Sequence, residues 1–266
     1  MSVDAVGLDA YYGDENNSLS LMTTDLVPAL DDRNLADNIV SKSNALVRAS
    51  FKLTLQEQRL VLLAISKLDS RKSHLTPRNS QTKVKITSIE FAETFGIDRK
   101  KAYEELRDAT NELFERKITE INGKKTDKLR WVSRATYHDG EGWAELSLSP
   151  DILPMLTLLR EKFTTYKLQK VANLRSTYSI RIFELCAQFS STGLLRIDLD
   201  ELIRLLDLPY TRYTDIVRRV ISPAVEELRA KSNLDIEWRP IKKGRAVKTI
   251  EFTFQESAQG KLPLEE

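Results

Sequence analysis

Arginine side chains gather near the start of one predicted helix in the second half of the chain. Arg212, Arg218 and Arg219 fall on its exposed side, and Asp215 lies between them. In the major groove of DNA, an arginine can donate two hydrogen bonds to guanine, and an aspartate can accept one from cytosine or orient an arginine. Most exposed charged helix faces are simply solvated, but a basic turn follows this helix. We therefore interpret it as a reader of DNA bases.

A turn rich in glycine and lysine follows each of two predicted helices. The first is Gly123-Lys-Lys-Thr-Asp-Lys128 and the second is Lys242-Lys-Gly-Arg245. Basic side chains at such turns hold phosphates and fix the register of a protein on DNA without reading its sequence. The β-type runs that flank the turns are 117–122 and 129–137 for the first, and 234–239 and 247–254 for the second. The candidate phosphate contacts are Lys124, Lys125, Lys242, Lys243, Arg245 and Lys248.

Both helices and both turns belong to a pattern that occurs twice. Residues 86–97 resemble residues 197–208, at an offset of 111 residues, with Phe95 matching Leu206. In each copy a strand end leads into a short helix, a tight turn, a longer helix and a basic hairpin. This is the layout of a winged helix, a variant of the helix-turn-helix motif that places its second helix in the major groove. The predicted fold class is α+β, with two tandem winged-helix domains behind a disordered acidic N-terminal tail.

The longer helix of the first copy begins at a predicted Asp98 cap and carries a regular apolar stripe. The stripe residues are Ala102, Leu106, Ala109 and Leu113. At 100° per residue, the candidate DNA contacts on the opposite side are Lys100, Tyr103 and Arg107. Glu104 and Glu105 dilute the positive charge on that side. The second copy is therefore the stronger candidate for sequence reading.

The longer helix of the second copy is predicted from about residue 213 to residue 230. Its apolar positions are Val217, Val220, Ala224 and Leu228. Pro223 should kink this helix, because proline lacks a backbone donor and clashes with the preceding turn. The candidate base contacts are Arg212, Tyr213, Asp215, Arg218, Arg219 and Ser222.

Short polar residues predict where other helices begin and end. Thr54, with Glu57 three residues later, predicts a capping box. Ser88 and Asp200 are the predicted caps of the two short helices. Gly96 is predicted to end the first of them, because glycine adopts the left-handed conformation readily.

The charge of the chain is unevenly distributed. Residues 1–38 hold eight acidic residues and one basic residue, a net charge of −7, so the whole-chain value of +2 leaves +9 on residues 39–266. An acidic leader ahead of a basic body favours a body that binds a polyanion. A leader that merely keeps the chain in solution explains the tail equally well.

These patterns divide the chain into four predicted regions. Residues 1–38 are the acidic disordered tail, and residues 257–266 are a flexible tail. Residues 39–162 are the N-terminal winged-helix domain, which we expect to end in an apolar helix over 150–162. Residues 163–256 are the C-terminal winged-helix domain.

Composition also bears on the compartment. The longest apolar runs are far shorter than the roughly 20 residues that a membrane span needs, and the N-terminus lacks the pattern of a secretory signal. Cys186, the one cysteine, excludes an internal disulfide framework. Its apolar neighbours predict a buried, unreactive thiol. We expect a cytoplasmic protein with no membrane partner.

An enzyme has little support. His74 and His138 are the two histidines, and neither has a partner at metal-ligand spacing. Gly123-Lys-Lys-Thr126 lacks the first glycine and the strand-to-helix context of a phosphate-binding loop. A rolling-circle nuclease would need paired histidines near a tyrosine. We therefore expect no catalytic activity, no metal and no cofactor.

Several longer segments resemble the iteron-binding replication initiator proteins of theta-replicating bacterial plasmids. Together these segments fall within residues 38–256, in the right order. They are Asn38-Ile-Val-Ser-Lys-Ser-Asn-Ala-Leu46, Leu53-Thr-Leu-Gln-Glu-Gln-Arg-Leu60, Phe163-Thr-Thr-Tyr-Lys-Leu168, Ser179-Ile-Arg-Ile-Phe-Glu-Leu185, Arg218-Arg-Val-Ile-Ser-Pro-Ala-Val-Glu-Glu-Leu228 and the hairpin from Lys242 to Phe254.

The resemblance implies a bacterial protein that binds direct repeats at a plasmid origin as a monomer and helps to open it. It also implies a dimer that binds an inverted repeat and represses its own gene, with the N-terminal domain as the dimer interface. Host replication proteins would be further partners. Residues 212–222 match the family's reading helix, and the basic residues of 242–245 match its phosphate contacts. The C-terminal domain would then be the principal reader.

Two alternatives remain open on the sequence. A chromosomal transcription regulator could have the same fold without a replication role. Several direct repeats near the gene would favour an initiator, and a lone inverted repeat would favour a regulator. A tandem winged-helix scaffold could bind protein instead of DNA. It would need apolar residues where Arg107, Arg218 and Arg219 place charge.

Overall fold

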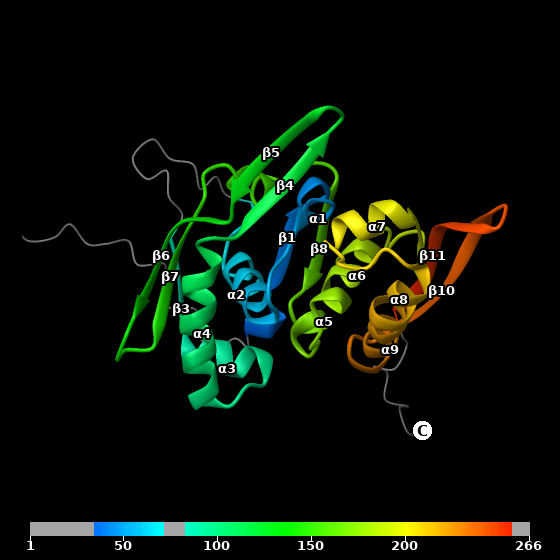
Figure 1. Cartoon of the computed structure of the whole chain (residues 1–266). Helices are drawn as coiled ribbons and strands as arrows, with labels where there is room; N and C mark the ends of the chain where they lie inside the picture. Colours follow the sequence, from blue (N-terminus) through cyan, green and yellow to red (C-terminus); the bar gives the residue numbers. More distant parts are fainter. Residues whose placement is uncertain (1–34, 72–82, 257–266) are drawn as a thin grey trace, which may run out of the picture. The chain divides into compact units, whose positions relative to one another are not determined.

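The computed structural model describes residues 35–71 and 83–256. The predicted acidic tail falls outside these ranges except for residues 35–38, and the predicted C-terminal tail and His74 fall outside them completely. The described residues form the mixed helix and strand structure expected of an α+β chain (Figure 1).

The residues before 163 contain the first winged helix. Its helix-turn-helix consists of α3 and α4, and α2 is the helix that precedes this unit. In chain order the elements are η1 (Leu35–Asp37), β1 (Ile39–Ser43), α1 (Asn44–Val47), β2 (Ser50–Phe51), α2 (Leu55–Ser66), β3 (Lys83–Thr87), α3 (Ser88–Phe95), α4 (Arg99–Leu113), β4 (Lys117–Asn122), β5 (Lys125–Arg130), β6 (Val132–His138), β7 (Trp143–Leu148) and η2 (Leu153–Met155).

The residues from 163 onward repeat the same order of elements. A strand and a short helix again come before a longer helix, a strand, a helix-turn-helix and a hairpin. These elements are β8 (Phe163–Lys167), α5 (Gln169–Ala172), α6 (Thr177–Ala187), β9 (Leu194–Asp198), α7 (Leu199–Leu205), α8 (Tyr213–Ile216), η3 (Val217–Ile221), α9 (Ser222–Lys231), β10 (Leu234–Lys243) and β11 (Ala246–Glu256).

Each helix-turn-helix is attached to a three-stranded antiparallel sheet of the same topology. The strand order is β3-β7-β6 in the first module and β9-β11-β10 in the second. Ile86 pairs with Ala144 in the first sheet, and Ile197 pairs with Ile250 in the second. All four side chains are buried. The prediction of two winged helices in tandem is therefore confirmed.

The wing of the first module is not the hairpin that the sequence predicted. Gly123 and Lys124 form the turn of β4-β5, and Lys125 is the first residue of β5. This hairpin belongs to a separate sheet with β2. The hairpin equivalent to β10-β11 is β6-β7, and the two first-module hairpins point in different directions (Figure 1). The run 129–137 was predicted as one strand, but Trp131 divides it. Trp131 is 1% exposed, and its ring meets that of Phe51 edge-on at 5.0 Å between centroids. The chain leaves the sheet of β5 at this residue and enters the sheet of β6.

The apolar helix predicted over 150–162 is also wrong. Only the single 3-10 turn η2 forms in that segment. Leu158 and Lys162 have φ angles of 54° and 52°, which is left-handed backbone that cannot continue a right-handed helix. The apolar residues of the segment are buried without helix, with Leu153 and Leu156 almost fully enclosed.

The caps explain where the other helices begin and end. Thr54 and Glu57 form the predicted capping box, and Asp98 accepts from the N–H groups of Lys100 and Lys101. Gly96 ends α3 in a left-handed conformation with φ 60°.

Two predicted caps move to a neighbouring residue. Thr87 takes the place predicted for Ser88 and forms a capping box with Glu90. Asp198 takes the N-cap position predicted for Asp200, and its side chain accepts a hydrogen bond from Thr249 instead of capping the helix. Both short helices therefore begin one or two residues earlier than their predicted caps imply.

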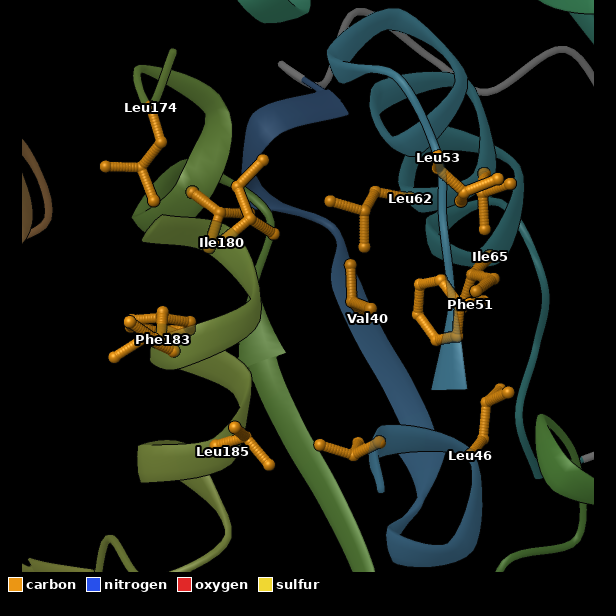
Figure 2. Packing of buried hydrophobic residues seen from close by; sticks show 14 of the residues in the cluster. Val40, Leu46, Phe51, Leu53, Leu62, Ile65, Leu174, Ile180, Phe183 and Leu185 are labelled. Carbon is orange, nitrogen blue, oxygen red and sulfur yellow. The ribbon is translucent and has the colours of Figure 1, made fainter. Parts of the chain in front are cut away.

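Strand β1 pairs with strand β8, so the segments that open the two modules form one two-stranded ribbon. Apolar residues pack across this ribbon into a common core (Figure 2). Val40 and Leu62 come from the first module, and Ile180 and Leu185 come from α6. The domain boundary predicted between residues 162 and 163 coincides with the start of β8, and it stays a prediction.

Candidate nucleic-acid interface

The predicted reading helix of the second module consists of three consecutive helical segments, and the name "reading helix" is kept for it and for α4 as the second helix of each helix-turn-helix. It runs through α8, the π-helical η3 and α9, with Ile216, Val220, Ala224 and Leu228 buried against the rest of the module. The Ser222 N–H donates to the carbonyl of Val217, five residues earlier. This wider turn precedes Pro223, which has no N–H to donate and takes its place in the first turn of α9. The irregularity predicted at Pro223 therefore takes the form of a π segment.

The arginines on this helix share one carboxylate. Asp215 lies 3.0 Å from Nη2 of Arg218 and 3.8 Å from Nε of Arg219. The guanidinium of Arg219 also lies 5.3 Å from the ring centroid of Tyr210. Both arginines remain open to solvent, with side chains 71% and 52% exposed. Asp215 therefore orients two arginines without burying them.

The other predicted positions of this helix have different surroundings. Arg212 occupies the N-cap position of α8 and is exposed. Tyr213 is half-buried, and burial raises the pKa of its hydroxyl. Ser222 lines a hollow of about 350 Å³ between α9 and β10, together with Glu226 and Trp238. The structure thus brings Asp215, Arg218 and Arg219 together. Ser222 lies apart from them, at the hollow between α9 and β10.

The wing of the second module is basic and exposed at its turn. Strands β10 and β11 meet at Gly244, whose φ of 66° requires the left-handed conformation that glycine tolerates. The exposed cations here are Lys242, Lys243, Arg245 and Lys248. None of them forms an ion pair with a carboxylate in the part of the chain that the structure describes.

The reading helix of the first module, α4, is a regular helix with the predicted core stripe fully buried. Lys100 is exposed near its start, and the side chain of Arg107 pairs with Asp108 at 3.1 Å. Tyr103 is used differently from the prediction. Its hydroxyl donates to Asp139 at 2.7 Å and accepts from the N–H of Gly140 at 2.9 Å. Tyr103 therefore ties the reading helix to the turn of β6-β7.

The first wing carries acidic and aromatic residues at its turn, where the second wing carries cations. Trp143 donates to Glu141 at 2.6 Å, and His138 stacks on the Trp143 ring at 4.9 Å. Lys85 of β3 lies 4.2 Å from the centroid of that ring. The hydrogen bond from Trp143 holds the pKa of Glu141 below its usual range. Sequence reasoning missed this wing, although its paired glycines in Asp139-Gly-Glu-Gly142 were a turn signal.

The lysines predicted for the first wing lie on the β4-β5 hairpin instead. Lys124 is exposed at its turn, and Lys125 pairs with Asp127 at 2.9 Å. Burial and the neighbouring Asp127 raise the pKa of Glu120 on the opposite strand. The charges of this hairpin are thus mixed, and it is not part of the sheet that carries the helix-turn-helix.

Other predicted features can be placed as well. Cys186 is buried, as predicted, and burial raises the pKa of its thiol. Within residues 35–71 and 83–256, no group of three or more histidine, cysteine, aspartate or glutamate side chains could hold a metal ion. In the same ranges, no helix has the length and apolar character needed to cross a membrane.

Known proteins match this chain over both modules. The family described as "Initiator Replication protein, WH1" matches residues 39–187, and the family described as "Initiator Rep protein, WH2" matches residues 198–254. A "Replication initiation protein" of Escherichia coli is 28% identical over 240 residues, covering 87% of this chain and 74% of its own length. A "Probable replication protein rep" of Bifidobacterium longum is 29% identical over 113 residues, which are 41% of this chain and 37% of that protein.

A solved structure shares the fold. The "Crystal structure of Pi initiator protein in complex with iteron DNA" superimposes with a TM-score of 0.72 at 22% identity, covering 84% of this chain and 99% of that chain. At this identity the likeness supports the tandem winged-helix fold. The resemblance inferred from the sequence is confirmed by the family matches, which together cover both helix-turn-helix units. The chain belongs to the initiator replication protein family.

Proposed function

We propose that this protein initiates plasmid replication by binding direct repeats at an origin as a monomer. Each module would place its reading helix in one of two successive major grooves of the same duplex. The observation that carries the proposal is that the two family matches include both helix-turn-helix units. Exposed cations on both reading helices support it. The crystal structure with a similar fold is, by its description, a complex with iteron DNA.

The second module is the proposed principal reader. Arg218 and Arg219 are exposed and oriented by Asp215, which is the arrangement that presents a guanidinium to the acceptor edge of guanine. Arg212, Tyr213 and Ser222 are further proposed contacts from the same helix. The wing cations Lys242, Lys243, Arg245 and Lys248 are proposed to contact phosphates, and their lack of carboxylate partners among the described residues supports this role.

The first module is the proposed auxiliary reader. Lys100 and Arg107 would contact DNA from α4, and Tyr103 would act mainly by holding the wing turn against that helix. Lys124 and Lys125 are on a hairpin outside this sheet. We therefore no longer assign them the phosphate contacts of the first wing.

The remaining expectations come from the family resemblance. As a dimer, the protein would bind an inverted repeat and repress its own gene, with the first module as the interface. Host replication proteins would join it at the origin in the bacterial cytoplasm. The reaction proposed is binding and opening of DNA, without a cofactor and without covalent catalysis.

Footprinting of the purified protein on the DNA that flanks its gene tests the proposal. We expect protection of several direct repeats, with two protected blocks in each repeat. A plasmid that carries those repeats should replicate only when the protein is supplied. Protection of a lone inverted repeat, with no replication in that assay, would identify a transcription regulator instead. Affinity that ignores salt would contradict DNA binding itself, because phosphate contacts release counterions.

A further inference from the structure

The two winged helices are joined by backbone hydrogen bonds as well as by the chain. Strand β1 opens the first module and β8 opens the second, and they pair along their full length from Ile39 with Lys167 to Ser43 with Phe163. Thr164 of β8 also donates to Asn44 of α1 at 2.7 Å. A two-stranded ribbon needs packing on one face for stability, and α2 and α6 supply it from opposite modules.

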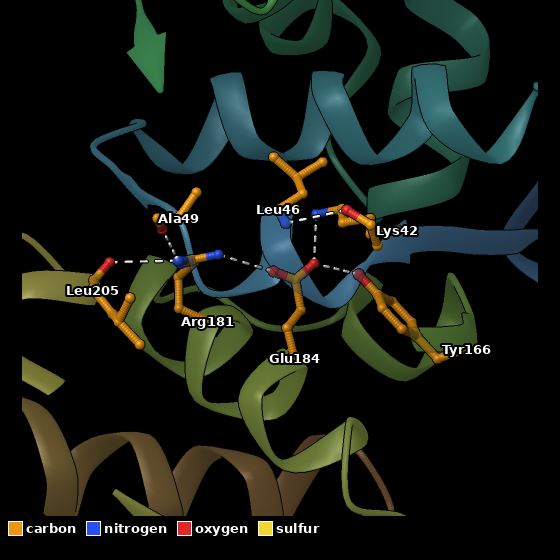
Figure 3. Close-up of polar contacts among 8 residues, drawn as sticks. Lys42, Leu46, Ala49, Tyr166, Arg181, Glu184 and Leu205 are labelled. Carbon is orange, nitrogen blue, oxygen red and sulfur yellow. Dashed lines mark hydrogen bonds and ion pairs between the residues drawn. The ribbon is translucent and has the colours of Figure 1, made fainter. Parts of the chain in front are cut away.

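A buried ionic network lies beneath this ribbon (Figure 3). Nζ of Lys42 lies 2.6 Å from Oε1 of Glu184, and the hydroxyl of Tyr166 donates to the same oxygen at 2.6 Å. Nη1 of Arg181 lies 3.4 Å from the other oxygen. Lys42 and Glu184 are 2% and 0% exposed. Burial alone would raise the pKa of Glu184, but two cations and the hydrogen bonds from Lys42 and Tyr166 hold it below its usual range.

Arg181 extends the network into both modules. Its Nη2 donates to the carbonyl of Ala49 at 2.8 Å and to the carbonyl of Leu205 at 3.4 Å. Its guanidinium lies 3.9 Å from the centroid of Phe51. Ala49 and Phe51 belong to the first module, and Leu205 is the last residue of α7, the helix before the second reading helix. The Arg181 side chain therefore links the first module to α7, the first helix of the second helix-turn-helix.

We call the ribbon, the buried network and the contacts around them the joint between the modules. On its solvent-facing side, half-exposed side chains also connect the two modules. Arg48 lies 2.7 Å from Glu201 of α7, and both side chains are about one-third exposed, at 33% and 32%. Ser50 donates to the carbonyl of Arg204 at 2.8 Å. The segment 48–51 thus contacts α7 through one ion pair and one hydrogen bond.

Directional contacts of this kind allow few alternative arrangements. A buried charge that loses its partner is strongly destabilising, so a shift of one module against the other would have to break several contacts at once. We propose that this joint fixes the distance and rotation between the two reading helices, which makes the protein selective for the number of base pairs between its two half-sites. Lys42, Arg181, Glu184, Arg48 and Glu201 are the positioning residues. The inference rests on the proposed function, because it concerns the same DNA contacts.

The geometry of DNA makes this selectivity measurable. One inserted base pair moves the second half-site by about 3.4 Å and rotates it by about 35°, since a helical turn of about 34–36 Å holds about 10–10.5 base pairs. A rigid joint cannot follow that displacement with both helices in their grooves. A loosened joint can follow it, at lower affinity for the natural spacing.

Fluorescence anisotropy with the full chain tests the proposal on the repeat found by footprinting, with no insertion or with one base pair between its protected blocks. Wild type should lose about 100-fold in affinity on the insertion, within the range that loss of specific contacts produces. Arg48→Ala and Glu201→Ala should each reduce that penalty a few-fold, because a half-exposed ion pair contributes less than the buried contacts that remain. The double exchange of Arg48→Glu with Glu201→Arg should restore the penalty in part, because Arg204, whose Nη2 lies 4.0 Å from Oε1 of Glu201, would then face a second cation. Glu184→Gln should lower the spacing penalty further, because it disrupts the buried network. If this variant does not fold, the variants of the half-exposed pair Arg48–Glu201 still test the proposal.

A matched control lies inside one module. Lys83→Ala removes the ion pair with Glu145, whose atoms are 3.1 Å apart and partly exposed. This variant should keep the full spacing penalty. The proposal is overturned if wild type binds the lengthened repeat within about threefold of the natural one, or if Arg48→Ala and Glu201→Ala both keep the wild-type penalty.

A measurement without DNA separates this inference from the proposed function. Spin labels on Glu104→Cys of α4 and Glu226→Cys of α9 report the distance between the reading helices, and buried Cys186 does not compete for the label. We expect a narrow distribution in wild type and a broader one after Arg48→Ala. A broad wild-type distribution would overturn the rigid joint even if the protein binds its repeats. Failure to bind repeats, with a narrow distribution, would instead contradict the proposed function.

Discussion

The two winged helices share a backbone plan and differ in what they expose. Their sheets have the same strand order, and the four paired residues at their centres are all buried. In the second module the wing turn is basic, with no carboxylate paired to it among the described residues. In the first, the wing turn is acidic and is held to α4 by Tyr103. Topology is thus retained where side chains pack, and chemistry diverges where they meet solvent.

The reading helices differ in the same sense. Helix α4 has a side-chain cap at Asp98 and a regular backbone. The second reading helix has no side-chain cap at Arg212 and includes a π segment between Val217 and Ile221. Such segments often occur at functional sites. The π segment contains Arg218 and Arg219, and both side chains are exposed. Helix α4 has no such segment, so the two helices differ in backbone as well as in exposed charge.

The largest expected effect is on stability, and it tests whether the two modules unfold together as one cooperative unit. Lys42→Met removes the partner of buried Glu184 and should lower the free energy of unfolding by about 3–5 kcal/mol. Denaturant unfolding should still show one transition, because the ribbon and the core are shared. Two separate transitions in wild type would contradict that view, and Lys83→Ala provides the control at a pair inside the first module.

The next largest effect is on DNA affinity, where loss of an arginine should cost more in the second module than in the first. Arg219→Ala should weaken repeat binding by about 1–3 kcal/mol and relax specificity at one base pair. Arg107→Ala should cost less than about 1 kcal/mol, because its partner Asp108 already engages the guanidinium at the surface. Anisotropy titrations on the natural repeat and on single-base variants measure both. Equal losses at the two positions would remove the distinction between principal and auxiliary reader.

The hairpins should differ in salt dependence. Lys243→Ala should weaken binding to all DNA sequences similarly and lower the slope of log affinity against log salt by about one. Lys124→Ala, on the β4-β5 hairpin, should leave the slope unchanged. Titrations between low and moderate salt give both slopes. A slope change at Lys124 alone would restore the first basic hairpin as the phosphate contact.

The smallest effect concerns acid stability of the second module. Glu227 accepts from the N–H of Arg175 and the hydroxyl of Ser179 at the start of α6. Burial would raise its pKa, but these bonds and Lys231 lower it. The stability gained is therefore complete above the unfolded pKa of about 4.3 and is lost as pH falls through the lower folded value. Glu227→Gln should flatten this acid loss below about pH 4.3 in thermal unfolding. An unchanged acid limb would show that Glu227 does not contribute it.

The sequence was most informative where a local period or cap determines the structure. The stripe on α4, the capping box at Thr54 and the end of α3 at Gly96 all depend on residues within a few positions of one another. The first wing was misassigned because alternation predicts strands but not their partners. Trp131, which moves the chain between two sheets, gains its burial from distant Phe51.

Partners far apart in sequence were beyond local reasoning altogether. Lys42 and Glu184 are 142 residues apart, and nothing near either one predicts a buried pair. The π segment could be anticipated only as an irregularity at Pro223, because its hydrogen bond depends on how the surrounding helix packs. Of the candidate site, the clustering of Arg218 and Arg219 was readable from spacing, and the role of Tyr103 at the wing was not.

The shared ribbon of β1 and β8 limits how the two halves of the protein can be exchanged by recombination. A recombination event that replaced everything after residue 162 with the same region of a relative would bring in a foreign β8, Glu184 and Arg181 against the resident β1 and Lys42. Such chimeras would have poorly matched contacts between the two modules, even if each module by itself had a native sequence. New DNA specificities should therefore arise by substitution on the exposed faces more readily than by shuffling whole halves, and residues 42 and 184 should change together across lineages.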